Sequence, residues 1–157
     1  MGHGYRGSVA TGVAVPHVDE AVPCQSASRE QTMQILLVQP DQNPGPVSFR
    51  AVAMPEPLAL EVLAALVPDH EVHILDLRVD PDLDHALALH KPDLVAVTSL
   101  TVEVYAARQI LQRVKEHSAH VFTAVGGHHA TLLPEDFQLP YVDAICLGEG
   151  EFVFPAL

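Results

Sequence analysis

Short apolar runs alternate with amphipathic segments along most of this chain. Runs in which nearly every residue is apolar are typical of strands buried on both faces. They occupy residues 33–39, 71–77, 93–100, 120–127 and 142–148. Apolar residues at helical spacing predict helices at 58–68, 82–93 and 103–117, and a shorter helix at 134–137. Buried strands alternating with amphipathic helices predict a parallel sheet that is covered on both faces.

This alternation restricts the topology. Right-handed crossover connections leave few possible strand orders for five such units. The sequence therefore predicts an α/β fold, a flavodoxin-like or Rossmann-like doubly wound five-stranded parallel sheet with the order 2-1-3-4-5. Ligands of such sheets bind at the carboxyl ends of the strands. The loops to examine therefore follow Gln39, Val97, Val125 and Leu147.

The two ends of the chain differ from this regular part. Residues 1–32 show no periodicity and are rich in small residues, which predicts a flexible N-terminal extension before a folded domain at 33–157. The segment from Glu151 to Leu157 resembles the beginning of a helix that has been cut short. A last strand without a covering helix would be an exposed edge, so we expect some self-association, such as a homodimer.

Composition and charge narrow the range of partners. The chain has 157 residues, 48% of them hydrophobic, which suits one domain with a real core. Its formal net charge of −12 argues against nucleic acid and against small polyanions. No apolar run reaches the roughly 18 residues of a membrane span, and no signal peptide is evident, so a cytoplasmic protein without a membrane partner is expected. Cys24 and Cys146 are too few for a disulfide framework, and Cys146 is predicted to be a core thiol.

The loops after the strands share small residues and hydroxyl groups, but none carries a familiar phosphate-binding or nucleophile motif. Glycine lets a ligand approach the backbone closely, and hydroxyl groups hydrogen-bond without bulk. Such loops suit a broad, largely uncharged ligand that lies over the strand ends. The plainer alternative is that the glycines merely turn the chain.

The motifs "VAVTSLT", "VGGHHATLLPEDF" and "VDAICLGEGE" occur in this order, after "LLVQP" and "HEVHILDL". Together they resemble the cobalamin-binding domain of cobalamin-dependent radical SAM enzymes, over about residues 33–157. The resemblance implies cobalamin as the cofactor, with no catalytic residue and no metal ligand in this domain. The residues that it implies for cofactor binding are Thr98, Ser99, Leu100, Thr101, Gly126, Gly127, His128, His129, Ala130, Thr131, Gly148, Glu149 and Gly150.

The broader cobalamin-binding fold carries D-x-H-x-x-G after the first strand, followed by S-x-L and G-G. By this likeness, Thr98–Leu100 takes the place of S-x-L, and Gly126 and Gly127 take the place of G-G. The first loop departs from the pattern, because Asn43 stands where the histidine ligand would be and Pro46 where the glycine would be. The resemblance therefore implies cobalamin bound base-off, without a lower histidine ligand from that loop.

His128 and His129 leave three interpretations open. They can be ordinary loop residues, one exposed and the other hydrogen-bonded to the backbone. Alternatively, His129 lines the cobalamin pocket and hydrogen-bonds the corrin or its tail. Direct ligation of cobalt is the least favoured, because adjacent side chains diverge and nothing else in the loop would orient the ring.

The resemblance implies a cobalamin-binding module, the N-terminal part of a radical SAM methyltransferase or cyclase, with the radical SAM domain as a partner in cis or in trans. This chain lacks the C-x-x-x-C-x-x-C that holds an iron–sulfur cluster, so the cluster and S-adenosylmethionine would belong only to a longer parent. The fragment alone is expected to be non-catalytic. The alternatives are a free-standing cobalamin carrier or sensor and a receiver-like signalling domain. The latter would need an acidic cluster near the first strand, an aspartate after the third strand and a lysine after the fifth, but the third strand ends in "TSLT" and the fifth in "GEGE".

Overall fold

The computed structural model describes residues 12–14, 32–41 and 56–157. Five parallel strands form the centre of its sheet, in the spatial order β3-β2-β4-β5-β6. This is the predicted order 2-1-3-4-5, which is confirmed. The strands are β2 (Gln34–Gln39), β3 (Glu71–Asp76), β4 (Leu94–Thr98), β5 (Phe122–Gly126) and β6 (Ala144–Leu147).

A sixth strand, β1 (Gly12–Ala14), pairs with the outer edge of β6 in antiparallel register, Gly12 opposite Leu147. The sequence predicted no strand in residues 1–32, because three small residues give no periodic signal. Most of that segment lies outside the described residues, as does the loop at 42–55. Since β1 covers the edge of β6, the unpaired last strand on which self-association was predicted is not found.

Helices follow the strands as the amphipathic pattern predicted, with one addition. The residues after Gly127 were predicted from the sequence to form a loop, whereas in the structure a helix begins there. Gly127 has φ +95°, and this conformation turns the chain directly from β5 into the helix. The helices are α1 (Leu58–Ala65), α2 (Leu83–His90), α3 (Val104–His117), α4 (His128–Leu132) and α5 (Gly150–Val153), with 3-10 turns η2 (Thr101–Glu103), η3 (Pro134–Phe137) and η4 (Phe154–Ala156).

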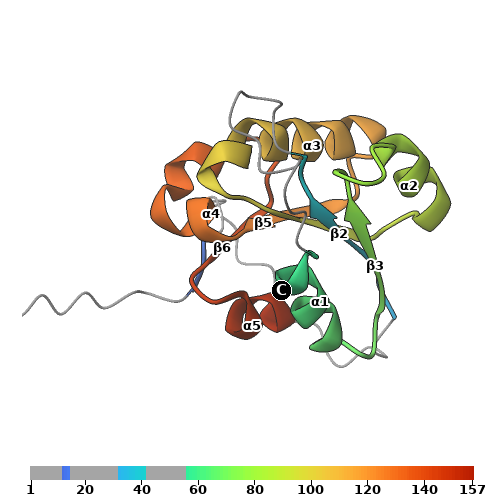
Figure 1. Cartoon of the computed structure of the whole chain (residues 1–157), viewed down its shortest axis with the longest axis horizontal. Coiled ribbons are helices and arrows are strands. Elements are labelled where there is room, and N and C mark those ends of the chain that lie inside the picture. Colours follow the sequence, from blue (N-terminus) through green and yellow to red (C-terminus); the bar gives the residue numbers. More distant parts are fainter. Residues whose placement is uncertain (1–11, 15–31, 42–55) are drawn as a thin grey trace, which may run out of the picture.

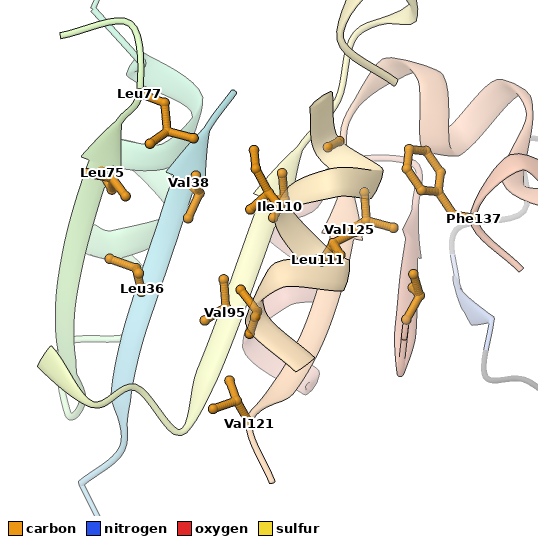
Figure 2. Packing of buried hydrophobic residues seen from close by; sticks show 14 of the residues in the cluster. Leu36, Val38, Leu75, Leu77, Val95, Ile110, Leu111, Val121, Val125 and Phe137 are labelled. Carbon is orange, nitrogen blue, oxygen red and sulfur yellow. The ribbon is translucent and has the colours of Figure 1, made fainter. Parts of the chain in front are cut away.

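The helices divide between the two faces of the sheet, with α2, α3 and α4 on one face and α1 and α5 on the other (Figure 1). On the first face, β-branched and leucine side chains from the strands meet α3 and Phe137. Figure 2 shows this packing, with Ile110 and Leu111 of α3 over Val95 and Val125 of the sheet. Phe137, Leu111 and Val125 are fully buried, so this face is a closed hydrophobic core.

The second face is built from smaller residues. Alternation along β4, β5 and β6 sends their valine and isoleucine side chains to the first face and their alanines to the second. The register places Ala96 opposite Ala124, and Ala124 opposite Ala144, so one row of alanines crosses three neighbouring strands. Leu60 of α1 and Phe154 pack against this row. A floor of methyl groups leaves room between the sheet and these two helical segments.

Asp143, just before β6, ties this end of the sheet to α3. Its Oδ2 accepts hydrogen bonds from Lys115 Nζ, Thr123 N and Thr123 Oγ1. Burial acts to raise the pKa of Asp143, but the hydrogen bonds from Lys115 and Thr123 outweigh it and hold this pKa below the usual range. The folded state therefore binds this proton less readily than the unfolded chain does.

The sign of this pKa shift predicts how Asp143 contributes to stability. A lowered folded pKa stabilises the fold at pH values above the unfolded value of about 3.9, and this contribution disappears as the pH falls through the folded pKa. The Asp143→Asn variant should therefore be less stable than the wild type near neutral pH, with the difference shrinking toward about pH 3. Urea unfolding at several pH values measures this, with exposed Asp69→Asn as the matched control. A difference that is independent of pH would contradict the prediction.

Candidate functional site

A cavity of about 400 Å³ opens at the carboxyl ends of the central strands, between the sheet and the helical segments α1 and α5. Its floor is formed by Ala96, Ala124 and Cys146 of the sheet, and Leu63 and Phe154 line its wall. Most of the loop residues expected from the resemblance surround it. Those that line it are Thr98, Gly126, Gly127, His128, Thr131, Gly148, Glu149 and Gly150. Pockets of roughly 300–1,000 Å³ typically hold small molecules and cofactors.

The remaining expected residues lie outside this lining. Ser99 is completely buried beneath the loop, and Leu100 and Thr101 are exposed at the same edge of the sheet. Ala130 is buried in the core of the opposite face. His129 is also buried away from the cavity. The expected residues thus lie at one edge of the sheet, but some line the cavity, some are exposed beside it and some are buried.

Gly127 is required by both its conformation and its neighbours. A Cβ at this position would lie 2.9 Å from Ser99 N and from Thr98 Oγ1, and 3.0 Å from Ser99 O. With φ +95° and ψ −174°, the backbone also occupies a region that is essentially restricted to glycine. The loop after β5 therefore packs directly on the loop after β4, and no side chain separates them at the mouth of the cavity.

Thr131 connects the loop after β5 with the loop after β6. Its hydroxyl donates to the Gly127 carbonyl at 3.1 Å and accepts from Gly148 N at 3.0 Å. Gly148 has φ +86°, so the backbone turns toward this hydroxyl as it leaves β6. The hydroxyl groups that the sequence singled out thus partly serve to hold the three loops in register.

The two histidines have separate environments. His128 is exposed and lines the cavity. The ring of His129, only 3% exposed, lies with Nε2 2.9 Å from Asp136 Oδ2 and Nδ1 3.3 Å from Thr101 Oγ1. Hydrogen bonding from His129, assisted by the charge of Arg108, lowers the pKa of Asp136. If the two histidines are ordinary loop residues, one ring should be exposed and the other hydrogen-bonded to the backbone. The exposure of His128 is confirmed, but the ring of His129 contacts side chains and not the backbone.

The role of Glu103 in this region was not predicted from the sequence. Glu103 is 1% exposed, and its carboxylate accepts hydrogen bonds from Leu100 N at 3.1 Å and Gln39 Nε2 at 3.1 Å. It therefore fixes the loop after β4, although the sequence placed it at the start of a surface helix. Cys146 is buried as predicted, and burial raises its pKa to about 11, so its thiol is protonated at neutral pH.

The described residues contain neither a cluster suited to a metal ion nor a helix suited to span a membrane. No group of three or more histidine, cysteine, aspartate or glutamate residues in that part of the chain could hold a metal ion. Within the same residues, no helix is long and apolar enough to cross a membrane.

Comparison with known proteins gives a consistent family. A model of the B12 binding domain matches residues 49–157. The chain is 32% identical over 134 residues to the uncharacterized methyltransferase PH0819 of Pyrococcus horikoshii, an alignment that covers 81% of this chain and 29% of that protein. It is 42% identical over 65 residues to the anaerobic magnesium-protoporphyrin IX monomethyl ester cyclase of Rubrivivax gelatinosus, covering 40% of this chain and 12% of that cyclase.

The corresponding cyclase of Cereibacter sphaeroides is 32% identical over 89 residues, which cover 53% of this chain and 14% of that protein. The chain thus spans less than a third of the length of each of these relatives. The resemblance to a cobalamin-binding domain is confirmed, because the B12 model matches more than half of the chain. With its five parallel strands in the order 2-1-3-4-5 and its cavity at their carboxyl ends, the chain belongs to the B12 binding domain family.

Proposed function

We propose that this chain holds cobalamin base-off, with the nucleotide tail in the cavity and the corrin over the carboxyl ends of the strands. The observation that carries this proposal is the cavity of about 400 Å³ between the sheet and α1 and α5, which opens beside Gly126, Gly127 and Gly148. Its floor of alanines is apolar and presents only short side chains to an aromatic base. Its mouth is lined by glycines, where a bulky group can approach the backbone.

Each part of the site would contribute in its own way. Leu60, Leu63 and Phe154 offer apolar surface to the base and exclude water from it. Thr98 would offer hydrogen bonds at the mouth, whereas the Thr131 hydroxyl and Gly148 N are already engaged with each other and with Gly127 and would keep the glycine loops in place. The acidic chain repels small polyanions, so the cofactor would be held through the backbone and neutral groups. The remaining members of the set, Ser99, Leu100, Thr101, His128, His129, Ala130, Glu149 and Gly150, would shape or support the edge on which the corrin lies.

The base-off state follows from the first loop, where Asn43 replaces the histidine of the broader family. That loop lies outside the described residues. His129 is engaged by Asp136 and Thr101, which leaves it unsuited to reach a cobalt ion. When bound, cobalamin would supply a cobalt centre that can carry a methyl group.

We further propose that the chain works as the N-terminal part of a longer cytoplasmic radical SAM enzyme, a methyltransferase or a cyclase. The names of the relatives support this, since one is called a methyltransferase and two are called cyclases. The iron–sulfur cluster and S-adenosylmethionine would then belong to the partner domain, in cis or in trans. The alternative is a free-standing cobalamin carrier or sensor. A C-x-x-x-C-x-x-C in the reading frame beyond Leu157 would favour the enzyme.

The proposal is tested by the visible spectrum. Purified protein is mixed with hydroxocobalamin and passed over a desalting column, and we expect corrin absorption bands of the base-off form in the protein fraction. His129→Ala should leave the base-off bands unchanged if this ring is not a cobalt ligand. Folded protein that elutes without corrin bands would overturn the proposal, and base-on bands would overturn its axial-ligand part.

A further inference from the structure

A chain of polar side chains leads from the opposite face of the sheet to the edge where the cofactor is proposed to lie. Arg108 NH2 donates to Asp136 Oδ1 at 2.7 Å, and Arg108 Nε donates to the Asp136 carbonyl at 2.7 Å. The other carboxylate oxygen, Oδ2, lies 2.9 Å from His129 Nε2. His129 Nδ1 in turn lies 3.3 Å from the hydroxyl of Thr101. The series runs from the half-buried guanidinium of Arg108 through the buried ring of His129 to the exposed residue Thr101.

The protons along this series have a defined order. Asp136 is ionised at neutral pH and can only accept, so His129 Nε2 must carry the hydrogen of their bond. In a neutral imidazole the other nitrogen, Nδ1, then has a lone pair and accepts. While His129 is neutral, the hydrogen of this bond therefore comes from the Thr101 hydroxyl, which donates it to Nδ1. The hydroxyl oxygen of Thr101 then has only lone pairs available to a ligand. Toward a ligand, Thr101 is therefore a hydrogen-bond acceptor.

Thr101 stands where a ligand over the strand ends would meet it. It is exposed, begins η2 and lies three residues after Thr98, which lines the cavity. The periphery of a corrin carries primary amides, whose N–H groups are donors. Free carboxylates, by contrast, have no hydrogen to donate to such an oxygen.

We propose that Thr101 accepts a hydrogen bond from a peripheral primary amide of the corrin, and that His129, Asp136 and Arg108 are positioning residues that fix its polarity. This inference rests on the proposed function, since it presumes a corrin at this edge. It gives the site a means to distinguish an amidated corrin from one bearing a free acid. Discrimination arises because a carboxylate would lie against oxygen lone pairs.

The test uses the full chain at about pH 8, where histidine is ordinarily neutral. Binding of cobalamin is compared with binding of its monocarboxylic acids, each with a different primary amide hydrolysed, by titration of the visible spectrum. For one of these acids the wild type should lose about tenfold in affinity, whereas Thr101→Val should bind cobalamin and that acid within about twofold of each other. Thr101→Ser, which keeps the hydroxyl, should restore the discrimination. Thr101 is exposed, so these variants leave the fold intact.

Asp136→Asn tests the polarity itself. Arg108 would hold the oxygen of the new amide, so the amide nitrogen would face His129 and donate to Nε2. The ring proton would then move to Nδ1 and be donated to Thr101, whose own hydrogen becomes free for the ligand. The preference should shift toward the acid, so that the tenfold discrimination is lost or reversed. Asp84→Asn, which removes another aspartate paired with an arginine, Arg113, is the matched control and should discriminate as the wild type does.

The outcomes separate this inference from the proposed function. Protein that retains no cobalamin at all contradicts the proposed function. Protein that binds cobalamin but treats every monocarboxylic acid alike in the wild type and in Thr101→Val overturns the inference. So does unchanged discrimination in a folded Asp136→Asn variant. If that variant does not fold, the comparison of Thr101→Val with Thr101→Ser still decides whether Thr101 makes the contact.

Discussion

Replacing Ala59 by phenylalanine is expected to lower the affinity of the chain for hydroxocobalamin by about 500-fold. Ala59 lies on α1, lines the cavity and is exposed, so the larger ring can enter the cavity without displacing core side chains. An aromatic base excluded from an apolar pocket forfeits the burial of about 150 Å² at roughly 25 cal/mol per Å², about 3–4 kcal/mol. Spectroscopic titration with hydroxocobalamin measures the loss.

The matched control is Val62→Phe, on the same helix but outside the lining of the cavity. We expect this control to bind hydroxocobalamin as the wild type does. Both variants should unfold within about 0.5 kcal/mol of the wild type, since each changes an exposed position. If Ala59→Phe binds with unchanged affinity, the tail does not occupy this cavity and that part of the proposed function is wrong.

The Gly127→Ala substitution should lower the free energy of unfolding by about 3 kcal/mol. Two costs add at this position. The backbone conformation, φ +95° and ψ −174°, is strained for any residue with a Cβ, and the new methyl group would meet backbone atoms of Ser99 within 3.0 Å. The loop after β4 would have to shift, although Ser99 N donates to Gly126 O and its carbonyl accepts from His129 N. Urea denaturation followed by circular dichroism gives the change directly.

Gly150→Ala is the control for Gly127→Ala. A Cβ at Gly150 would lie 3.2 Å from Leu63 Cδ2, the end of a flexible side chain that can move, and no positive φ is involved. We expect its stability to stay within about 1 kcal/mol of the wild type. Equal stability of Gly127→Ala and the wild type would show that the close contact between the two loops does not exist in solution.

The architecture of the sheet could be predicted because its cause is local and repetitive. Apolar runs such as "ILLV" and "DLVAV" require burial on both faces, and the intervening amphipathic helices require a parallel sheet beneath them. The handedness of the crossovers then leaves few strand orders, of which 2-1-3-4-5 was predicted. The strand β1 could not be predicted this way. Its three small residues become a strand only because the edge of β6 offers backbone hydrogen bonds.

The site was predicted in part. Glycines and hydroxyl groups after each strand marked the edge, since such residues are visible in the sequence as departures from apolar runs. The floor and wall of the cavity were missed. The signal for the floor was an alanine between larger residues in "VAV", "TAV" and "DAI", but its meaning depends on register, which pairs Ala96 with Ala124 and Ala124 with Ala144. Ala59 and Phe154 join them from segments far away along the chain.

The sequence by itself therefore determined the five parallel strands and their order, most of the helices, and the edge at which a ligand belongs, because hydrophobic periodicity and glycine placement act over a few residues. Only the tertiary structure decided which of two adjacent histidines faces the cavity and which is buried against Asp136. It also decided that Glu103 fixes a loop, because the fold places Gln39 Nε2, at the end of β2, within 3.1 Å of the Glu103 carboxylate. Such pairings join residues distant along the chain, so they exist only once the strands have found their register and the helices have packed on the sheet.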